Sequence, residues 1–355
     1  MRKKILLDLS ILKDIYCGLG QVALNYGKYY QQHYIASEAD FQLYLLVPKN
    51  MVGAFGNEVK YITSTWFRKH LQIFYPKFDV WHSIHQLSRF RPFFRSTKQI
   101  LTIHDLNFIH EKKNPLKVDR YLKKIQAKVN RATEIVCISE FAKKEVEEYI
   151  NVKGKTVEVI YNGVEQLDKR LAIKPSFAGE NSKPFFFTIG QVREKKNFHV
   201  LLPLMKLFPE KELYIAGHDK SDYAQYIQNM IDSEGIKNVH LVGLVSNNER
   251  IWLYKNCEAF FFPSLFEGFG LPIIEAMSFG KPVFSSKETS LQEVGGSHAF
   301  FWDSFEADDM KKLIDDSLEK FYASPIHSQE NINYVNSFSY EKHMEKYMKI
   351  YKSLL

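Results

Sequence analysis

The chain has 355 residues, of which 45% are hydrophobic and 25% are charged. This length is too great for one typical domain and suits two, each able to bury its own core, and the composition is that of a globular protein rather than a disordered one. The three scattered cysteines are odd in number, so they indicate neither a disulfide framework nor a zinc motif and fit a reducing cytoplasm. No apolar stretch reaches the length of a membrane span.

The net charge of +7 is unevenly distributed along the chain. Residues 1–150 carry 24 Lys and Arg against 14 Asp and Glu, a balance of +10, whereas the remainder carries 24 against 27, a balance of −3. Arginines alternate with phenylalanines between Arg89 and Arg95, and residues 117–128 bear further basic residues at helical spacing. Such runs are usually solvated faces. No nucleic-acid motif accompanies them, and attraction to an anionic membrane leaflet is the main alternative.

Short apolar runs alternate with longer amphipathic stretches, which predicts α/β units with largely parallel sheets. We expect strands in the first half at residues 3–10, 41–48, 78–84, 99–105, 134–139 and 157–162, and in the second half at residues 183–190, 211–217, 239–243, 259–264 and 281–286. The start of the chain is interpreted as the first of these strands rather than as a signal peptide, because Asp8 interrupts its apolar run.

A polar segment at residues 167–184, which contains Pro, Gly and Ser, predicts the break between two doubly wound domains. We expect a first domain at residues 1–168, a second at residues 169–335 and a closing helix at residues 336–355. In that last segment the apolar residues Met344, Tyr347, Met348 and Tyr351 recur at helical spacing.

The most informative stretch is PSLFEGFGLPIIEAMSFGKPV, at residues 263–283. Glu267 and Glu275 flank a turn that contains Gly268 and Gly270, and Pro272 stands where a helix should begin. Glycines let a backbone approach a ligand closely, and the N–H groups of a helix start attract anions. Ionised carboxylates accept hydrogen bonds from sugar hydroxyls. These features outline a nucleotide-sugar site. The alternative is an ordinary turn whose Glu275 complements the helix dipole.

The whole phrase resembles the signature of the retaining GT-B-fold glycosyltransferases of family 4, the group 1 glycosyltransferases. Within that family, TIHDL at residues 102–106 and the Lys-Asn pair at residues 196–197 look most like those of mannosyltransferases. The resemblance continues through residues 290–314 and touches most of the chain. It implies an α/β GT-B fold, in which two doubly wound Rossmann-like domains face each other across a cleft and a C-terminal helix crosses back to the first. It also implies that Glu267 binds the hydroxyls of the transferred sugar and Glu275 the ribose. The donor-binding residues between them are Gly268, Phe269, Gly270 and Leu271.

A basic loop from Gly190 to Asn197 follows the first strand of the second half. Cations there would stabilise the charge that grows on the β-phosphate of a nucleotide sugar, although an exposed basic loop is the ordinary alternative. Family members carry an Arg directly after the Gly and a Lys before the Asn. Lys196 matches the second position and is a catalytic candidate. Gln191 stands at the first position, so either Arg193 replaces the missing arginine at the donor or the enzyme works with one cation there.

Three further assignments come from the resemblance. Gly18 and Gly20 correspond to a glycine-rich loop beneath the donor diphosphate, and Val245 lies in a loop whose backbone contacts the nucleobase. His104, at the end of a predicted strand, would lie in the cleft beside the transferred sugar as a catalytic candidate. The alternative for His104 is a partly buried histidine with satisfied hydrogen bonds. Ser139 is predicted to cap a helix.

No Asp-x-Asp and no cluster with metal spacing occurs in the sequence, so we expect no metal and no other cofactor. The resemblance implies transfer of a hexose from a nucleotide sugar to a glycan or lipid-linked glycan, with retention, in polysaccharide biosynthesis such as that of lipopolysaccharide or capsule. GDP-mannose is the preferred donor, and UDP-glucose and related donors remain open. We expect a cytoplasmic enzyme, with peripheral contact to the inner face of the membrane as an option, and no nucleic-acid partner. The alternatives are a sugar-nucleotide epimerase and a catalytically silent binding subunit of the same fold.

Overall fold

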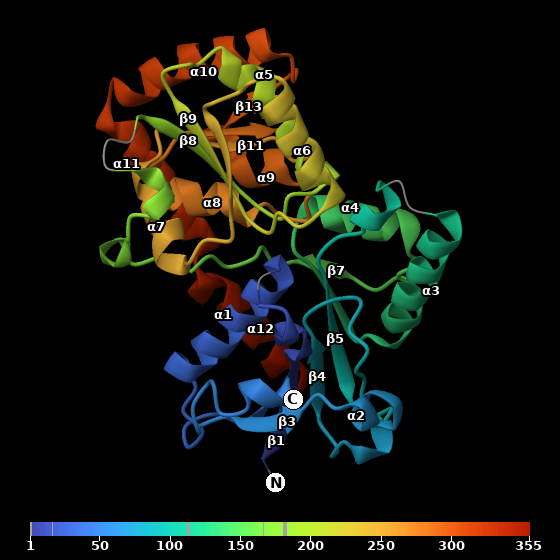
Figure 1. Ribbon diagram of the computed structural model, residues 1–355. Helices are drawn as coiled ribbons and strands as arrows, with labels where there is room; N and C mark the ends of the chain where they lie inside the picture. The colour runs from blue at the N-terminus through green and yellow to red at the C-terminus, as the bar shows by residue number, and fades with distance from the viewer. Residues whose placement is uncertain (1, 16, 112–113, 166, 180–182) are drawn as a thin grey trace. The chain divides into compact units, whose positions relative to one another are not determined.

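A computed structural model describes residues 2–15, 17–111, 114–165, 167–179 and 183–355 (Figure 1). The chain forms two compact units. Unit 1 comprises Met1–Gly163 and Tyr340–Leu355, and unit 2 comprises Val164–Ser339. The first limit lies at Gly163 rather than at residue 168 because Val164 already pairs with Ser339, and its N–H donates to the carbonyl of Phe338 at 2.9 Å. Part of the predicted linker, residues 180–182, lies outside the described residues.

Unit 1 is built on a parallel sheet with the strand order β3-β2-β1-β4-β5-β6-β7. The strands are β1 (Lys3–Asp8), β2 (Phe41–Val47), β3 (Lys60–Thr63), β4 (Val80–Ser83), β5 (Lys98–Ile103), β6 (Glu134–Cys137) and β7 (Val157–Val159). The helices are α1 (Gly18–His33), α2 (Trp66–His70), α3 (Pro115–Arg131), α4 (Glu140–Tyr149) and α12 (Tyr340–Leu354). Ser139 caps α4 as predicted, since its Oγ accepts the N–H of Ala142 at 3.0 Å.

Helix α12 is part of unit 1 although it follows unit 2 in the sequence, and Figure 1 shows it beside α1. A buried polar network holds it there. His343 donates from Nδ1 to the carbonyl of Tyr161 at 2.7 Å and accepts at Nε2 from Tyr26 of α1 at 2.9 Å. Tyr351 lies 2.7 Å from Nδ1 of His82, in β4. Because each of these polar atoms is paired, burying them does not leave an unsatisfied group.

Unit 2 repeats the same architecture with the parallel strand order β10-β9-β8-β11-β12-β13. The strands are β8 (Phe185–Ile189), β9 (Glu212–Ala216), β10 (Val239–Gly243), β11 (Ala259–Phe262), β12 (Val283–Ser286) and β13 (Phe300–Trp302). The helices are α5 (Leu201–Lys206), α6 (Asp222–Ser233), α7 (Asn247–Asn256), α8 (Leu271–Ser278), α9 (Leu291–Gly295), α10 (Ala307–Tyr322) and α11 (Pro325–Val335). Both orders are those of Rossmann-like sheets, which confirms the predicted α/β class.

The central strands of unit 2 are almost entirely apolar because helices cover both faces of a parallel sheet. Phe186 and Phe187 of β8 and Phe260 and Phe261 of β11 are fully buried. The predicted strands all contain an observed strand, but β3 and β13 were not predicted. Both lie at the edge of a sheet and have four and three residues, so neither shows a clear periodic pattern in the sequence.

Candidate functional site

The strand order of unit 2 reverses between β8 and β11, the point at which open α/β sheets bind ligands beyond the carboxyl ends of their strands. Two loops meet there, residues 190–197 after β8 and residues 263–270 after β11. The N–H of Leu265 donates to the carbonyl of Lys195 at 2.8 Å and joins the two loops. The basic loop and the Glu-Gly-Phe-Gly turn therefore lie side by side at the reversal point of the strand order.

Lys196 and Glu267 form an ion pair across these loops. Nζ of Lys196 lies 2.5 Å from Oε1 of Glu267, and the two side chains are only 11% and 15% exposed. Oγ of Ser264 also lies 2.7 Å from Oε1 of Glu267. The backbone of Glu267 is fixed as well, because its N–H donates to Thr289 at 3.1 Å and its carbonyl accepts from Ser290 at 3.0 Å. The pair is thus held rigidly at the reversal point of the strand order.

The electrostatics of this pair keep Glu267 ionised. Burial on its own would raise the pKa of the Glu267 carboxyl, but the charges of Lys196 and Lys195, together with hydrogen bonds from Lys196 and Ser264, outweigh it and lower the pKa below its usual value. Nζ of Lys196 also lies 4.8 Å from the centre of the Phe262 ring, in a cation–π arrangement. A cation and a carboxylate acceptor are therefore present side by side at neutral pH.

Glycines let the loops approach one another this closely. A Cβ on Gly190 would lie 3.0 Å from Cε of Lys196, and one on Gly217, after β9, would lie 1.9 Å from the carbonyl oxygen of Gly190. Gly217 also has a φ of +135°, which side chains rarely allow. A side chain at position 190 would thus press against Lys196, and one at position 217 would clash with the backbone of Gly190.

The turn that leads into α8 has the geometry that its glycines predict. Gly270 is the N-cap of α8 with φ of +103°, and a Cβ there would meet Leu291 at 2.6 Å. Pro272 occupies the first turn, and Gly268 and Phe269 are buried while Leu271 is half-buried. The N–H of Ile273 already donates to the carbonyl of Gly270 at 3.0 Å, so this amide is engaged within the turn.

Glu275 lies on α8, but the structure does not pair it with Lys196. Its carboxylate accepts from Nη1 of Arg250 at 3.1 and 3.3 Å and from the hydroxyl of Tyr254 at 2.8 Å, both on α7. The Glu275 charge is the main reason why the pKa of Arg250 is raised. Sequence analysis missed Arg250 and Tyr254. The only local signal is the capping box of Ser246 and Glu249, which marks the start of α7 without indicating which side chains face Glu275.

The remaining candidates of unit 2, Arg193 and Val245, also lie in loops that follow strands. Arg193 immediately precedes the short helix Glu194–Lys196, and its side chain is exposed, whereas Gln191 is half-buried. Val245 is half-buried just before the N-cap of α7, the helix that carries Arg250. The loops bearing Lys196 and Val245 thus follow β8 and β10, on the carboxyl side of the same sheet.

In unit 1, His104 follows β5 and is buried. Its Nε2 lies 2.8 Å from the carbonyl oxygen of Ile84, so Nε2 carries the proton and donates, and its N–H donates to Oε1 of Gln86 at 3.1 Å. Burial lowers the pKa of His104 to about 4, even though the hydrogen bond to Ile84 works in the opposite direction. His104 is therefore neutral at pH 7 and presents Nδ1 as an acceptor.

Gly18 and Gly20 are in the first turn of α1 and not in a loop, which corrects the sequence-based prediction. The N–H of Gly20 donates to Sγ of Cys17 at 3.3 Å, the cap of the helix. A Cβ on Gly20 would lie 2.0 Å from the carbonyl oxygen of Asp14, so glycine is needed for the chain to pack against itself here. Close packing explains Gly20 and overrides the low helix propensity of glycine.

Neither a metal site nor a membrane span is found in the part of the chain that the structure describes. No group of three or more His, Cys, Asp or Glu side chains in that part is arranged to hold a metal ion. Within the same ranges, no helix combines the length and the hydropathy needed to cross a bilayer.

Comparison with known families covers both units. Residues 31–166 match the family described as Glycosyltransferase Family 4, and residues 169–332 match the family described as Glycosyl transferases group 1. The chain belongs to the family 4, or group 1, glycosyltransferases. The predicted family is therefore confirmed, and its second match contains Lys196, Glu267 and Glu275.

Individual relatives include mannosyltransferases. The chain is 28% identical over 244 residues to the serotype-specific mannosyltransferase WbdA of Escherichia coli, a match to 63% of this chain and 30% of WbdA. It is 28% identical over 198 residues to the O-antigen chain mannosyltransferase RfbU of Salmonella typhimurium, covering 55% of this chain and 54% of RfbU. The matches thus span about a third and about half of the length of these relatives.

Solved structures share the fold at low sequence identity. Sucrose-phosphate synthase from Thermosynechococcus elongatus superposes with a TM-score of 0.74 at 16% identity, over 99% of each chain. HepE of Anabaena, solved in complex with UDP-glucose, gives the same TM-score, identity and coverage. These similarities, together with the two Rossmann-like sheets, confirm the predicted GT-B fold.

Proposed function

We propose that this chain transfers a hexose from a nucleotide sugar to a glycan or lipid-linked glycan, with retention of configuration and without a metal ion. The observation that carries the proposal is the buried pair of Lys196 and Glu267, 2.5 Å apart at the strand-order reversal of unit 2. A cation and a carboxylate in contact suit a ligand that joins a phosphate to a sugar, because the phosphate requires a cation and the sugar hydroxyls require acceptors.

The proposed chemistry assigns each group a role. As the bond between the anomeric carbon and the β-phosphate oxygen breaks, negative charge grows on the phosphate and Lys196 stabilises it. Glu267 holds Lys196 in position and accepts hydrogen bonds from the sugar. A bond forms between the anomeric carbon and the acceptor oxygen on the same face, and the acceptor proton passes to the departing phosphate. His104, neutral with Nδ1 as an acceptor, would bind a hydroxyl of the sugar in this scheme.

The nucleotide would be held by Glu275 and by the backbone at Val245. In this proposal the ribose hydroxyls donate to Glu275, whose orientation Arg250 and Tyr254 fix. GDP-mannose is the preferred donor because the relatives include mannosyltransferases, while the UDP-glucose complex of HepE keeps a uridine donor in consideration. O-antigen chain enzymes among the relatives favour a polysaccharide acceptor.

A thermal-shift panel of nucleotide sugars tests the donor, because a ligand that binds only the folded state raises the melting temperature. Release of the nucleoside diphosphate is then measured with and without acceptor glycans, and the anomeric configuration of the product is determined by NMR. We expect acceptor-dependent release that disappears in Lys196→Ala and persists in Lys206→Ala, a control at a surface pair with Glu234 in the same unit.

Other outcomes would favour the alternatives. Acceptor-independent interconversion of the sugar nucleotide would identify an epimerase. Binding of the nucleotide sugar without any release, over a broad acceptor panel, would identify a catalytically silent subunit. Product formation with inversion would contradict the proposed mechanism but would still identify the protein as a transferase.

A further inference from the structure

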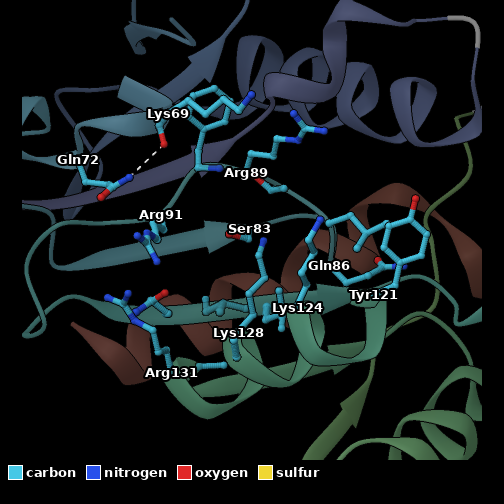
Figure 2. A pocket seen from close by; sticks show the side chains of 18 of the residues that line it. Lys69, Gln72, Ser83, Gln86, Arg89, Arg91, Tyr121, Lys124, Lys128 and Arg131 are labelled. Carbon is cyan, nitrogen blue, oxygen red and sulfur yellow. Dashed lines mark hydrogen bonds between the residues drawn. The ribbon is translucent and has the colours of Figure 1, made fainter. Parts of the chain in front are cut away.

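Unit 1 contains a cavity of about 610 Å³ that is lined by basic residues (Figure 2). His104 is not part of its described lining, although Gln86, the partner of the His104 N–H, is. Six cationic side chains from three segments of the chain contribute to its wall: Lys69, Arg89, Arg91, Lys124, Lys128 and Arg131. Figure 2 shows the last three projecting from α3 and Arg89 and Arg91 projecting from the chain that follows β4. No Asp or Glu is found among the described lining residues.

An unusual connection creates this cavity. Parallel strands are normally joined by a helix that covers the sheet, but residues 84–97, between β4 and β5, contain no helix. Ile100 and Leu101 of β5 therefore form part of the cavity wall, together with Leu87 and Phe90 of the connection. On α3, Lys124, Lys128 and Arg131 follow one another at spacings of four and three residues, so they share one face of the helix.

The cavity has a surplus of positive charge, which the nearby Asp8 offsets in part at Lys128. Nζ of Lys128 is buried without a hydrogen-bond partner. Burial lowers the pKa of Lys128 to about 8, although the nearby charge of Asp8 acts in the opposite direction. Asp8 itself accepts from Ser88 and from the N–H of Ser10, so part of its hydrogen-bonding capacity is already used. A buried ammonium group without a partner is costly.

The arginines show the same imbalance. The pKa of Arg131 is lowered by burial and then by the charges of Arg91 and Arg95. In the described part of the chain no carboxylate lies within ion-pair distance of Arg89, Arg91 or Arg131. Several cations that repel one another around a concave space, with guanidinium groups that can bind oxyanions in pairs, form a suitable site for a compact anion with several oxygens.

We propose that this cavity binds a phosphate or diphosphate group and that, given the proposed function, this group is the charged end of the acceptor. The apolar part of the wall then contacts the hydrocarbon next to the phosphate, as in an isoprenyl diphosphate. This proposal identifies the acceptor class as a phosphate-bearing lipid or glycan. It differs from a general attraction to anionic membranes because it requires a concave site with the buried Lys128.

Calorimetry on the full chain tests the proposal with two probes, inorganic pyrophosphate and farnesyl diphosphate. The titrations use the Lys196→Ala variant, which lacks the cation expected to bind diphosphate in unit 2. We expect both probes to bind, with affinity reduced about tenfold or more by Arg91→Gln or Lys128→Gln. The control is Lys123→Gln, which removes the same charge from α3 but at an exposed side chain that pairs with Asp119.

The results separate the sources of the phosphate. Tighter binding of farnesyl diphosphate than of pyrophosphate, lost in the cavity variants, supports a lipid-linked acceptor. Equal binding of the two probes, with the same sensitivity to Arg91→Gln, supports a phosphate site for a soluble acceptor. Arg91 is exposed, so its variant should remain folded if Lys128→Gln is unstable.

Two results would overturn the proposal. One is that the three variants Arg91→Gln, Lys128→Gln and Lys123→Gln all bind each probe with the same affinity. The other is recruitment to vesicles of anionic phospholipid without binding of either soluble probe, which would indicate only a charged membrane-facing surface. The proposed function is judged separately, since it predicts stabilisation by a nucleotide sugar in the wild type and in Arg91→Gln alike.

Discussion

Removing one partner of the Lys196–Glu267 pair should destabilise unit 2 far more than removing both. Lys196→Met leaves Glu267 in a site where its side chain is only 15% exposed, and breaking a buried pair in this way costs roughly 3–5 kcal/mol. We expect a value near the lower end, about 3 kcal/mol, because Ser264 remains as a hydrogen-bond partner. Glu267→Gln should cost a similar amount because Lys196 then loses its counter-charge, whereas the double variant should recover most of the loss.

The effect of Lys196→Met should depend on pH in a defined direction. Lys196→Met removes the largest of the influences that lower the pKa of Glu267 and leaves those of Lys195 and Ser264. We expect burial then to dominate and to raise this pKa above its unfolded value. The folded state then favours the protonated carboxyl, so the penalty is full above the raised folded-state pKa and disappears as the pH falls toward the unfolded value of about 4.3. The wild type, whose Glu267 pKa is lowered, loses the contribution of this group as the pH falls.

Hydrogen–deuterium exchange of peptides from β8 and β11 measures the free energy of opening in unit 2 without interference from unit 1. The control is a second cycle at Lys206 and Glu234, a surface pair with side chains 47% and 36% exposed, where we expect a coupling below about 1 kcal/mol. If the effects of Lys196→Met and Glu267→Gln add within about 0.5 kcal/mol in the double variant, the two groups are not coupled and the reasoning is wrong.

Three further predictions follow from the same contacts. Glu275→Ala should weaken binding of the nucleoside diphosphate in calorimetry, because ribose contacts would be lost in ground and transition states alike, and unchanged affinity would remove the ribose assignment. Transfer should continue in excess EDTA, and a complete loss that Mg²⁺ or Mn²⁺ restores would show that the phosphate chemistry is different. His82 and His343 are buried, and burial lowers their pKa values to about 3 and about 4. These pKa values lie below the unfolded value of about 6.5, so the folded state of unit 1 favours the neutral histidines. As the pH falls from about 6.5 toward 4, each of the two histidines should therefore lower the free energy of unfolding of unit 1 by up to roughly 1.4 kcal/mol for every pH unit. Melting curves against pH test this, since His343→Gln should flatten the dependence, and an equal slope in the variant would contradict it.

The architecture could be predicted because its signals are local and repeated. Runs such as FFFTI in β8 and AFFF in β11 can only be stable where both faces of a strand are covered. The sequence around Glu267 also predicted correctly that Glu267 lies in a turn and Glu275 on the helix that follows it. The edge strands β3 and β13 could not be predicted because pairing with a neighbouring strand defines them, and the sequence of a single short segment does not contain that information.

The partners of the site residues were less predictable. Arg250 and Tyr254 reach Glu275 from 25 and 21 residues away in sequence, and no short motif encodes that contact. The sequence around Lys196 is that of an exposed basic loop, and replacing an exposed lysine should leave the stability of the protein unchanged. The structure instead buries it next to Gly190 and pairs it with Glu267. The basic cavity exists because the connection between β4 and β5 contains no helix. In the sequence this connection is only an irregular segment, which does not predict a cavity.

The position of α12 has a consequence for the order in which the protein folds during synthesis. Unit 2 is contiguous in sequence and can be completed as soon as residue 339 leaves the ribosome, whereas unit 1 lacks α12 until later. Until then Tyr26, His82 and Thr102 lack the hydrogen-bond partners that α12 supplies, although His82 and Thr102 still bond to each other. We therefore expect unit 2 to become resistant to proteolysis before unit 1, although most of unit 1 is synthesised first. Released chains that end at residue 339 should show a protected unit 2 and a cleavable unit 1 in limited proteolysis, and equal protection of both units would contradict this order.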